Sequence, residues 1–234
     1  MKATVVAATT LVGPPVSIEE TRAGMDMNYS WDEIEDIDVL HEFAGRACYK
    51  SWDKPNPKTE ANEDYLAHII DSQHESVLEH GSVTFYIEGV SRSLLLELER
   101  HRHLSFSVES QRYVSTSKHH DEPVIPPLFE REDMTSQKAL LIAHYRKSLN
   151  QYDMAYCDAR DAGVGVKQAR EAARAFLPNC TPVDFVVTGN MRTWKYVIAK
   201  RDAEGADAEI REFAQVIANE LRDYAPNSMQ STNK

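Results

Sequence analysis

The residues best suited to chemistry lie in one short stretch of the chain. An Arg-His-Arg triplet at 100–102 is followed by His103 and, nine residues later, by Arg112. Between Arg92 and Arg112 four arginines outnumber three glutamates, although the whole chain carries a formal net charge of -11. An arginine guanidinium can give two parallel hydrogen bonds to a phosphate or a carboxylate. The stretch therefore predicts a binding site for a multiply charged anion such as a phosphate.

Two other interpretations of this stretch can be weighed on the residues alone. Cations at a helix C-terminus interact favourably with the helix dipole, which explains Arg100 and Arg102 without any ligand. It does not explain the polar residues that continue through Ser110, Gln111 and Arg112. A nucleophilic role for Ser110 has little support, because no GxSxG motif surrounds it.

Histidines and glutamates also gather at residues 74–80, which read His-Glu-Ser-Val-Leu-Glu-His. A metal site is one interpretation, but neither an HExxH nor an HxxEH motif is present. His74 and His80 are six residues apart, which on a regular helix places them on opposite sides. The pattern favours a turn with hydrogen-bonding histidines, and the metal site stays the alternative.

A third polar group begins at Asn190, a residue type that caps helix N-termini. Arg192 and Tyr196 are four residues apart and would share one helix face. On their own, these residues, Arg174 and Arg201 are typical of a solvated surface. Neither a GxGxxG nor a Walker loop occurs in the chain.

The composition limits the class of protein. The chain has 234 residues, of which 42% are hydrophobic and 27% charged, as in a globular protein with a substantial core. Its acidity argues against binding to nucleic acid or to an anionic membrane, and no run approaches the roughly 20 apolar residues of a membrane-spanning helix. Cys48, Cys157 and Cys180 show no CxxC spacing, which favours a reducing, cytoplasmic location.

The hydrophobic pattern predicts one α+β domain over residues 1–234, with mixed helices packed on a small, mainly antiparallel sheet. The first segment superficially resembles a secretion signal, but its β-branched residues favour a buried strand. The predicted strands are 2–12, 82–88, a β-like stretch at 105–114, and 182–188. The predicted helices open at a Ser30/Glu33 capping box, near Ala61, at Ser91, at Thr135 or Ser136, before Leu177, at Asn190 and at Ala206. Gly89 is expected to end its strand, and the tail after Pro226 is expected to fray.

Taken together, these segments resemble the flavin-dependent thymidylate synthases, the ThyX family. The family motif is Arg-His-Arg, any seven residues, then Ser, and it is met by 100–102 and Ser110 and extended by 111–113. Further blocks similar to those of the family lie at 46–51, 74–85, 174–178 and 190–192, with Arg201 nine residues on. The resemblance spans roughly residues 40 to 224 in the family's order.

The resemblance implies reductive methylation of dUMP to dTMP, with 5,10-methylenetetrahydrofolate as carbon donor and NADPH as reductant through bound FAD. It implies no metal, and a homotetramer with active sites shared between subunits. The implied flavin-binding residues are Ser51, His74, Ser76, Glu79, Arg100, His101, Arg102, Asn190, Met191, Arg192 and Tyr196. The implied nucleotide-binding residues are Arg92, Glu97, Leu98, Glu99, Arg100, Val108, Glu109, Ser110, Gln111, Arg112, Arg174 and Arg201.

Arg201 is the residue that the resemblance assigns to catalysis, since its charge would stabilise negative charge developing on the uracil ring.

Three positions depart from the family pattern. Val108 stands where many members carry Gln or Glu, Tyr196 replaces a common Asn or His, and Gly205 replaces a common His.

Two other classes of function remain open on the residues alone: a nucleotide-phosphate binding module without redox chemistry, and a metal hydrolase. The histidines available to such a hydrolase are His74, His80, His101 and His103.

Overall fold

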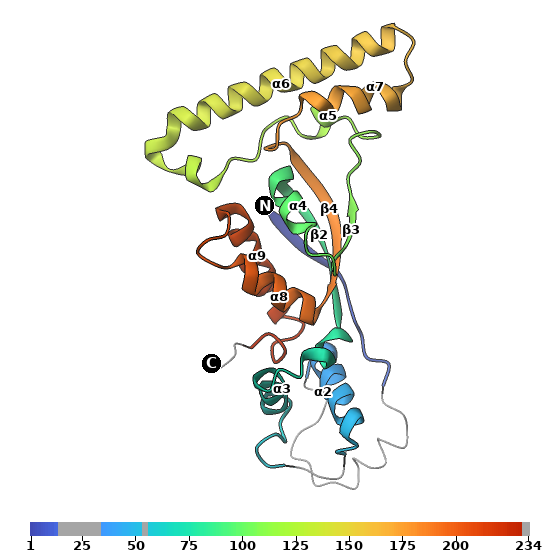
Figure 1. Cartoon of the computed structure of the whole chain (residues 1–234), viewed down its shortest axis with the longest axis vertical. Helices are drawn as coiled ribbons and strands as arrows, with labels where there is room; N and C mark the ends of the chain where they lie inside the picture. Colours follow the sequence, from blue (N-terminus) through green and yellow to red (C-terminus); the bar gives the residue numbers. More distant parts are fainter. Residues whose placement is uncertain (14–33, 53–55, 231–234) are drawn as a thin grey trace. The chain divides into compact units, whose positions relative to one another are not determined.

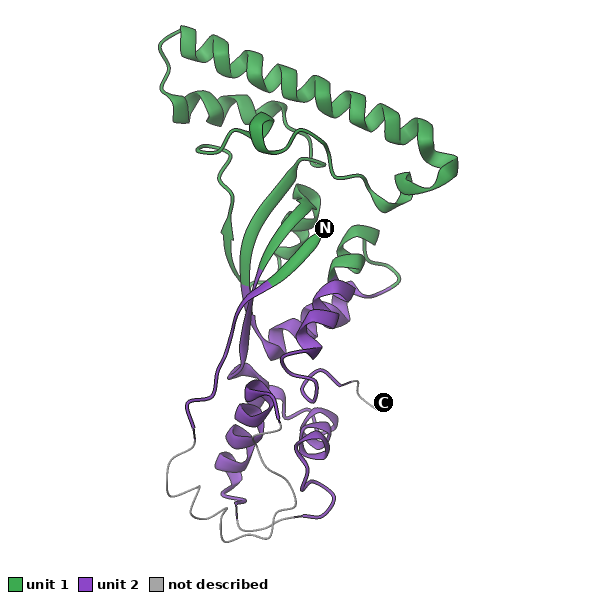
Figure 2. Cartoon of the chain, turned by 180° about the vertical axis from the view of Figure 1, so that it is seen from behind, with its two compact units in different colours: residues 1–4, 86–187, 204–213 green, residues 5–85, 188–203, 214–234 purple. Residues whose placement is uncertain are grey.

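A computed structural model of the protein describes residues 1–13, 34–52 and 56–230 (Figure 1). The chain divides into two compact units (Figure 2). Unit 1 comprises Met1–Thr4, Tyr86–Val187 and Glu204–Phe213, and unit 2 comprises Val5–Phe85, Thr188–Ala203 and Ala214–Lys234. The sequence has no composition step at these boundaries, and the expectation of a single domain stays a prediction.

One four-stranded sheet is formed, with the strand order β1-β2-β4-β3. Its strands are β1 (Lys2–Ala8), β2 (Ser82–Ser91), β3 (Ser105–Val108) and β4 (Pro182–Asn190). Strands β1 and β2 pair antiparallel. Thr9 N, just after β1, donates to the carbonyl of Ser82 at the start of β2, while Lys2 at the start of β1 forms an ion pair with Glu88 near the end of β2. The predicted fold class, helices with a small antiparallel sheet, is confirmed.

Alternation along the two central strands explains which face of the sheet is buried. In β2 the side chains of Val83, Phe85 and Ile87 are fully buried, while the residues between them are half-buried. This pattern places every second side chain on the core face, as the sequence predicted. In unit 2 the indole of Trp194 packs edge-on against Phe85, with ring centroids 5.3 Å apart. Trp194 Nε1 also donates a hydrogen bond to the Val83 carbonyl, so its polar atom is satisfied within the core.

Unit 1 carries a helical layer beyond the strands. Its helical elements are α4 (Arg92–Leu98), α5 (Thr116–His119), η3 (Pro127–Glu130), η4 (Glu132–Met134), α6 (Thr135–Asp161), α7 (Val166–Ala173), η5 (Arg174–Phe176) and the start of α9 (Ala208–Arg222). Helix α7 packs along α6 (Figure 1), and its small residues Ala169 and Ala173 are buried. Helix α4 is fixed by three buried leucines, Leu94, Leu95 and Leu98.

Unit 2 contains a smaller set of helices. They are α2 (Asp36–Tyr49), α3 (Asn62–Asp71), η2 (Glu75–Glu79), α8 (Met191–Arg201) and the rest of α9. Helix α2 contacts α3 and η2, and η2 in turn contacts α8. The short 3-10 helix η2 is therefore held between two longer helices.

Most predicted elements are present, with corrected ends. The helix start predicted at Ser91 and the cap predicted at Asn190 are confirmed, since the two side chains accept bonds from Leu94 N and Thr193 N. Gly89 does not end β2, which continues to Ser91. Gly89 has a positive φ of 70°, which glycine adopts at no steric cost, so the strand can pass through this position. The β-like stretch 105–114 is a strand only over Ser105–Val108, and the first strand ends at Ala8 rather than residue 12. The prediction that this first strand is buried is wrong, because all residues of β1 are exposed or half-buried.

Three predicted helix starts are also corrected. The Ser30/Glu33 capping box lies outside the described residues, and α2 begins only at Asp36, after Glu35. Helix α6 begins at Thr135 with Met134 at the N-cap position, so neither Thr135 nor Ser136 caps it. The helix expected before Leu177 forms as α7 followed by the 3-10 helix η5. The last helix, expected from Ala206, runs as α9 from Ala208 to Arg222.

The prediction that the tail after Pro226 frays is wrong for residues 227–230. Ser228 is fully buried, and its backbone N–H donates to Asp38 Oδ1 at 2.9 Å. Asn227 N donates to the other oxygen of the same carboxylate at 2.7 Å. The reason is the buried Asp38, whose charge has to be solvated by protein donors once water is excluded.

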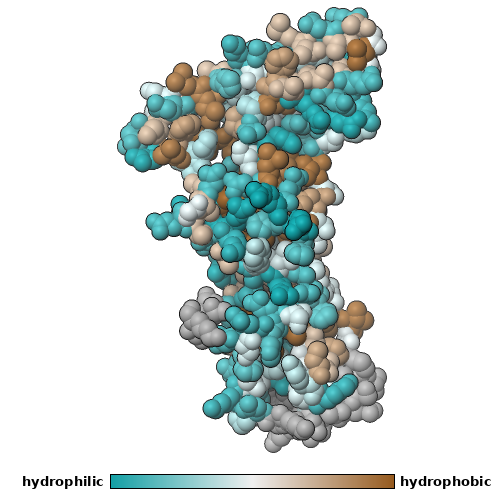
Figure 3. Space-filling model, viewed as in Figure 1, coloured by the Kyte–Doolittle hydropathy of each residue, from teal (hydrophilic) through white to brown (hydrophobic). Residues whose placement is uncertain are grey.

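Large apolar side chains reach the surface of unit 1 on its helical layer (Figure 3). Leu140 and Met154 on α6 are 69% and 65% exposed, and Phe176 in η5 is 47% exposed. Such a concentration of exposed apolar area is typical of a surface that contacts another protein. Within the part of the chain that the structure describes, no helix is both long and apolar enough to cross a membrane.

Candidate active site

The Arg-His-Arg triplet directly follows α4 in unit 1. Ser91 caps this helix, and Glu209 accepts two hydrogen bonds from Ser91, one from N at 2.8 Å and one from Oγ at 2.6 Å. The helix is thereby anchored at its start. Just after its end, His101 N donates a backbone hydrogen bond to the Leu98 carbonyl. Arg100 and Arg102 are exposed at this helix end. Two cations are thus held on a rigid support and remain open to a ligand.

The second half of the motif forms a tight turn after β3. Tyr113 N and Val114 N both donate to the Ser110 carbonyl at 2.9 Å. Arg112 Nε lies 2.9 Å from Glu171 Oε2 on α7, yet the same Nε is buried and makes no hydrogen bond to any described residue. The distance shows an ion pair, and the missing hydrogen bond shows that the N–H points away from the carboxylate. The Arg112 guanidinium is therefore only partly satisfied by protein groups.

Two further arginines of unit 1 share one electrostatic environment. Arg92, the first residue of α4, is half-buried, and its N–H donates to the Thr181 carbonyl at 3.1 Å. Burial is the largest cause that lowers the pKa of Arg92, the nearby Arg174 lowers it further, and Glu99 and Glu109 act in the opposite direction. Arg174 is exposed, and two guanidinium groups that repel each other favour an anion between them.

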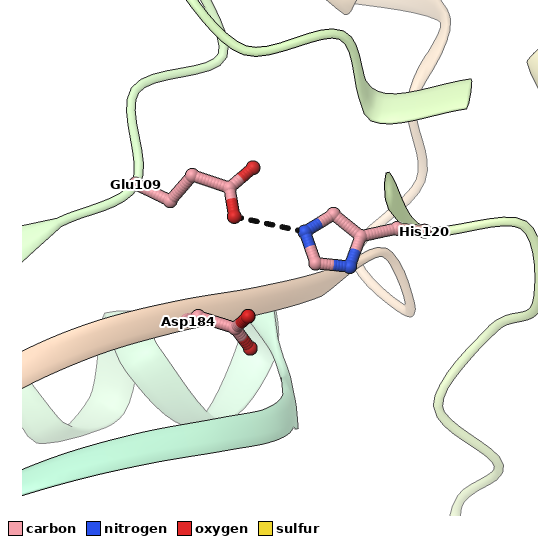
Figure 4. A group of neighbouring side chains, drawn as sticks. All are labelled: Glu109, His120 and Asp184. Carbon is pink, nitrogen blue, oxygen red and sulfur yellow. Dashed lines mark hydrogen bonds and ion pairs between the residues drawn. The ribbon is translucent and has the colours of Figure 1, made fainter. Parts of the chain in front are cut away.

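A histidine that the sequence analysis did not single out joins this region. His120 Nε2 donates to Glu109 Oε2 at 3.0 Å, and Asp184 on β4 points toward the same space (Figure 4). The ligand atoms of Glu109, His120 and Asp184 all lie within 4.8 Å of one another, the one such group among the described residues that could hold a metal ion. The hydrogen bond to Glu109 raises the pKa of His120, so the imidazolium form is favoured.

Five of the predicted flavin-binding residues of unit 2, His74, Ser76, Glu79, Arg192 and Tyr196, lie on or next to η2 and α8, which are in contact. Arg192 Nη1 donates to Glu79 Oε1, and Arg192 Nε lies 3.8 Å from Glu75 Oε2. His74, Ser76, Glu79, Arg192 and Tyr196 are all exposed. The two segments therefore present a cation, carboxylates, a hydroxyl, an imidazole and a phenol on one part of the surface of unit 2.

The remaining predicted residues of unit 2 have different environments. Met191 is fully buried, and its N–H donates to the Gly81 carbonyl at 2.9 Å. The Asn190 amide oxygen is used as the helix cap. Ser51 follows α2, where its N–H donates to the Arg46 carbonyl at 3.1 Å. Arg201 is half-buried at the end of α8. Met191 can thus contribute its backbone or its packing, but its side chain is not accessible to a ligand.

The predicted site residues are therefore distributed over both units. Unit 1 holds the nucleotide candidates other than Arg201, with Leu98 buried in the core and Glu97 and Val108 half-buried. It also holds the flavin candidates at 100–102, while the other flavin candidates belong to unit 2. A Cβ atom at Gly205 would have no other atom within 4 Å. A side chain at this position, such as the histidine common in the family, would therefore meet open space here.

His120 and Asp184 are the residues that sequence reasoning missed in unit 1. They lie 11 and 75 residues from Glu109 in the chain, and neither belongs to a recognisable motif. The available signal was the charged Asp184 within the apolar first part of its strand. That residue accepts a hydrogen bond from Gly89 N at 3.1 Å and so also supports the neighbouring strand β2.

Known proteins similar to this chain agree on one family. The sequence model of the family described as "Thymidylate synthase complementing protein" matches residues 31–227. A probable flavin-dependent thymidylate synthase of Mycobacterium phage D29 is 49% identical over 233 residues, which cover 98% of this chain and 95% of the relative. A flavin-dependent thymidylate synthase of Mycolicibacterium vanbaalenii is 50% identical over 193 residues, 80% of this chain and 76% of the relative.

Proposed function

Because the chain belongs to the family of flavin-dependent thymidylate synthases, we propose that it converts dUMP to dTMP with 5,10-methylenetetrahydrofolate as carbon donor, NADPH as reductant and FAD as the bound flavin. The resemblance found in the Arg-His-Arg motif is confirmed, and with it the class of enzyme, a methyltransferase of dTMP biosynthesis. The observation that carries the proposal is the group of cations in unit 1 around the motif segment.

The nucleotide phosphate has a suitable set of donors in unit 1. Arg92 and Arg174 lie close enough to affect each other electrostatically, and a dianionic phosphate between them would relieve their repulsion. Arg112 Nε is buried and lies 2.9 Å from Glu171 Oε2 without a hydrogen bond to any described residue, and Ser110 lies in the adjoining turn. We assign Ser110 to binding of the nucleotide. The Glu109 carboxylate already accepts a hydrogen bond from His120. We propose that its contact with the nucleotide uses another acceptor position of the same carboxylate.

The donor set on η2 and α8 fits a flavin dinucleotide. Arg192 supplies a cation suited to a diphosphate, and His74, Ser76 and Glu79 supply hydrogen-bonding groups suited to hydroxyls and ring atoms. Ser51, Asn190, Tyr196 and the triplet 100–102 complete the proposed set. FAD would supply the electron chemistry that side chains cannot perform, while the protein binds and orients the reactants.

Arg201 is the proposed catalytic residue. A guanidinium placed at the uracil carbonyls stabilises negative charge that develops on the base during reaction, and it does so without forming a covalent bond. This role requires no protein nucleophile, in agreement with the lack of a nucleophile motif around Ser110. The half-buried position of Arg201 at the end of α8 would strengthen the electrostatic effect relative to a fully hydrated side chain.

We further propose that the enzyme acts in the cytoplasm as a homotetramer with active sites shared between subunits. The exposed apolar residues of the helical layer, Leu140, Met154 and Phe176, support assembly, since isolated domains rarely expose so many. The measurement is the mass of the protein in solution by light scattering. A monomer at micromolar concentration would remove this part of the proposal.

An absorption spectrum of the purified protein tests the proposed function directly. We expect a yellow protein with flavin bands that bleach when NADPH and dUMP are added, and dTMP when methylenetetrahydrofolate is also present. A colourless protein that still binds dUMP would indicate a nucleotide-binding module instead. A colourless protein with stoichiometric zinc would favour a hydrolase.

A further inference from the structure

Unit 2 contains a buried chain of hydrogen bonds that none of the assigned roles uses. Asp38, His41 and Ser228 are all fully buried. The Ser228 hydroxyl donates to Asp38 Oδ1, and its Oγ lies 2.7 Å from His41 Nδ1. Gly81 N donates to His41 Nε2 at 3.1 Å. Three segments that are far apart in the sequence, α2, Gly81 and Ser228, are thus joined through one imidazole.

The direction of the protons in this chain follows from its ends. A backbone N–H can only donate, so His41 Nε2 has to be the acceptor from Gly81 and carries no proton. Burial, with the nearby His80, lowers the pKa of His41 to about 3, so the ring is neutral. A neutral imidazole with a bare Nε2 carries its proton on Nδ1. His41 Nδ1 therefore donates to Ser228 Oγ, and Ser228 donates to the Asp38 carboxylate.

Gly81 is where this relay meets the proposed flavin site. A Cβ at residue 81 would lie 2.6 Å from Ile37 Cγ2 and 2.7 Å from His41 Nε2, so only glycine allows the backbone to approach the ring. The Gly81 carbonyl accepts a hydrogen bond from Met191 N, the first residue of α8. Helix η2 ends two residues earlier, at Glu79. One residue thus connects the end of η2, the start of α8 and the buried imidazole.

A second connection runs from the C-terminal segment to α8. Lys195 Nζ donates to the Ser228 carbonyl at 2.8 Å and to the Gln230 carbonyl at 3.1 Å. Ser228 is therefore bound on one side by Asp38 and His41 of α2 and on the other by Lys195 of α8. Its position is determined by both helices at once.

We propose that His41 and Ser228 are positioning residues for flavin binding, because their relay holds Gly81 and thereby fixes η2 relative to the start of α8. This inference rests on the proposed assignment of Glu79, Arg192 and their neighbours as flavin ligands. Neither His41 nor Ser228 touches the flavin. Their effect is to keep the groups on η2 and α8 at the separation that the cofactor requires, as supporting residues do for other sites.

Two substitutions of His41 separate positioning from simple anchoring of the C-terminus. In His41→Gln the side-chain amide can reach the Nε2 position and accept from Gly81, but the Nδ1 donor is lost. In His41→Asn the amide can replace Nδ1 as donor to Ser228, but nothing reaches Gly81. The two variants each keep one hydrogen bond of the relay and lose the other.

The measurement is the FAD dissociation constant of the apoprotein reconstituted with FAD, together with visible circular dichroism of the bound flavin. We expect His41→Asn to weaken FAD binding about tenfold, equivalent to about 1.4 kcal/mol, and His41→Gln to stay within about threefold of the wild type. The wild-type dichroism should be kept by His41→Gln and lost by His41→Asn. Equal weakening in both variants, or weakening in neither, would overturn the proposal.

A spectroscopic readout covers the case in which His41→Asn fails to fold. The 15N shifts of His41 in the wild type should show a proton on Nδ1 and none on Nε2, and Ser228→Ala should shift part of the population to the other tautomer and weaken FAD binding. An unchanged tautomer with unchanged FAD affinity would contradict the relay. Arg192→Ala tests the flavin assignment separately. If this variant retains FAD, the flavin assignment fails. If Arg192→Ala loses FAD while the His41 and Ser228 variants keep it, only the proposed relay is contradicted.

Discussion

His120 Nε2 lies 3.0 Å from Glu109 Oε2, and this ion pair fastens the end of α5 to the residue that precedes Ser110. Both side chains are shielded, with 9% and 18% of their surface exposed. The His120 carbonyl accepts a hydrogen bond from Tyr145 Oη of α6 at 2.8 Å, so the imidazole is itself held in place. The turn that we propose to bind the nucleotide is thus supported from α6 through a titratable group.

The first prediction concerns the pH dependence of stability. Because the hydrogen bond to Glu109 raises the pKa of His120, the pair should stabilise the protein below the ordinary histidine pKa of about 6.5, an effect lost as the pH rises through the folded-state pKa. We expect His120→Gln to lower the free energy of unfolding by about 1–2 kcal/mol at pH 6 and by less at pH 9.

Urea unfolding at the two pH values measures this difference, with the flavin removed so that binding does not contribute. Glu109→Gln is the matched variant and should show the same pH dependence, with the double variant no less stable than the worse single one. A penalty for His120→Gln that is equal at pH 6 and pH 9 would show that the imidazole acts only through packing.

The second prediction concerns the phosphate site. Arg174→Ala should raise the dissociation constant for dUMP by about 10- to 100-fold, since charge-assisted hydrogen bonds to a charged group contribute about 1.5–3 kcal/mol. Flavin content should be unchanged. Arg131→Ala is a suitable control, because Arg131 is exposed and pairs only with the nearby Asp133 among the described residues. Unchanged dUMP affinity in Arg174→Ala, measured by calorimetry, would remove Arg174 from the site.

The third prediction concerns catalysis. Arg201→Ala should reduce the rate of dTMP formation in a single turnover by about 10²–10³-fold, the usual cost of one lost electrostatic donor. FAD should remain bound, because the charge is proposed to act on the base. Arg222→Ala on the exposed side of α9 controls for loss of a surface cation. Near-normal turnover in Arg201→Ala would exclude the proposed role.

The fourth prediction separates binding from nucleophilic catalysis at Ser110. Ser110→Ala should keep measurable activity and show a higher KM for dUMP, because only one hydrogen bond of the turn is lost and the backbone bonds to the Ser110 carbonyl remain. Complete loss of dTMP formation with dUMP still bound would reopen the nucleophile hypothesis. Mass spectrometry of the quenched reaction would then identify any covalent adduct.

Features set by local sequence were predicted well. The alternation of Val83, Phe85 and Ile87 identified the core face of β2, Ser91 was recognised as a helix start, and Asn190 as a helix cap. The reason is that side-chain direction in a strand and capping at a helix start depend on residues within a few positions of one another. The family resemblance was likewise readable from the ordered motif blocks.

Features that join distant segments were not predicted. Ser228 was expected in a frayed tail, yet it bonds to Asp38, 190 residues away. The outcome depends on which partners burial brings together, and no local pattern contains that information.

By itself the sequence determined the residue types available for chemistry, the main helices and strands, and the family to which the chain belongs. Only the tertiary structure decided that Glu109 is held by His120 and that His41 has a backbone donor on one side and a serine on the other. The physical reason is that a buried polar group has to find its hydrogen-bond partner in space. That partner is set by how strands and helices pack, whatever the separation along the chain.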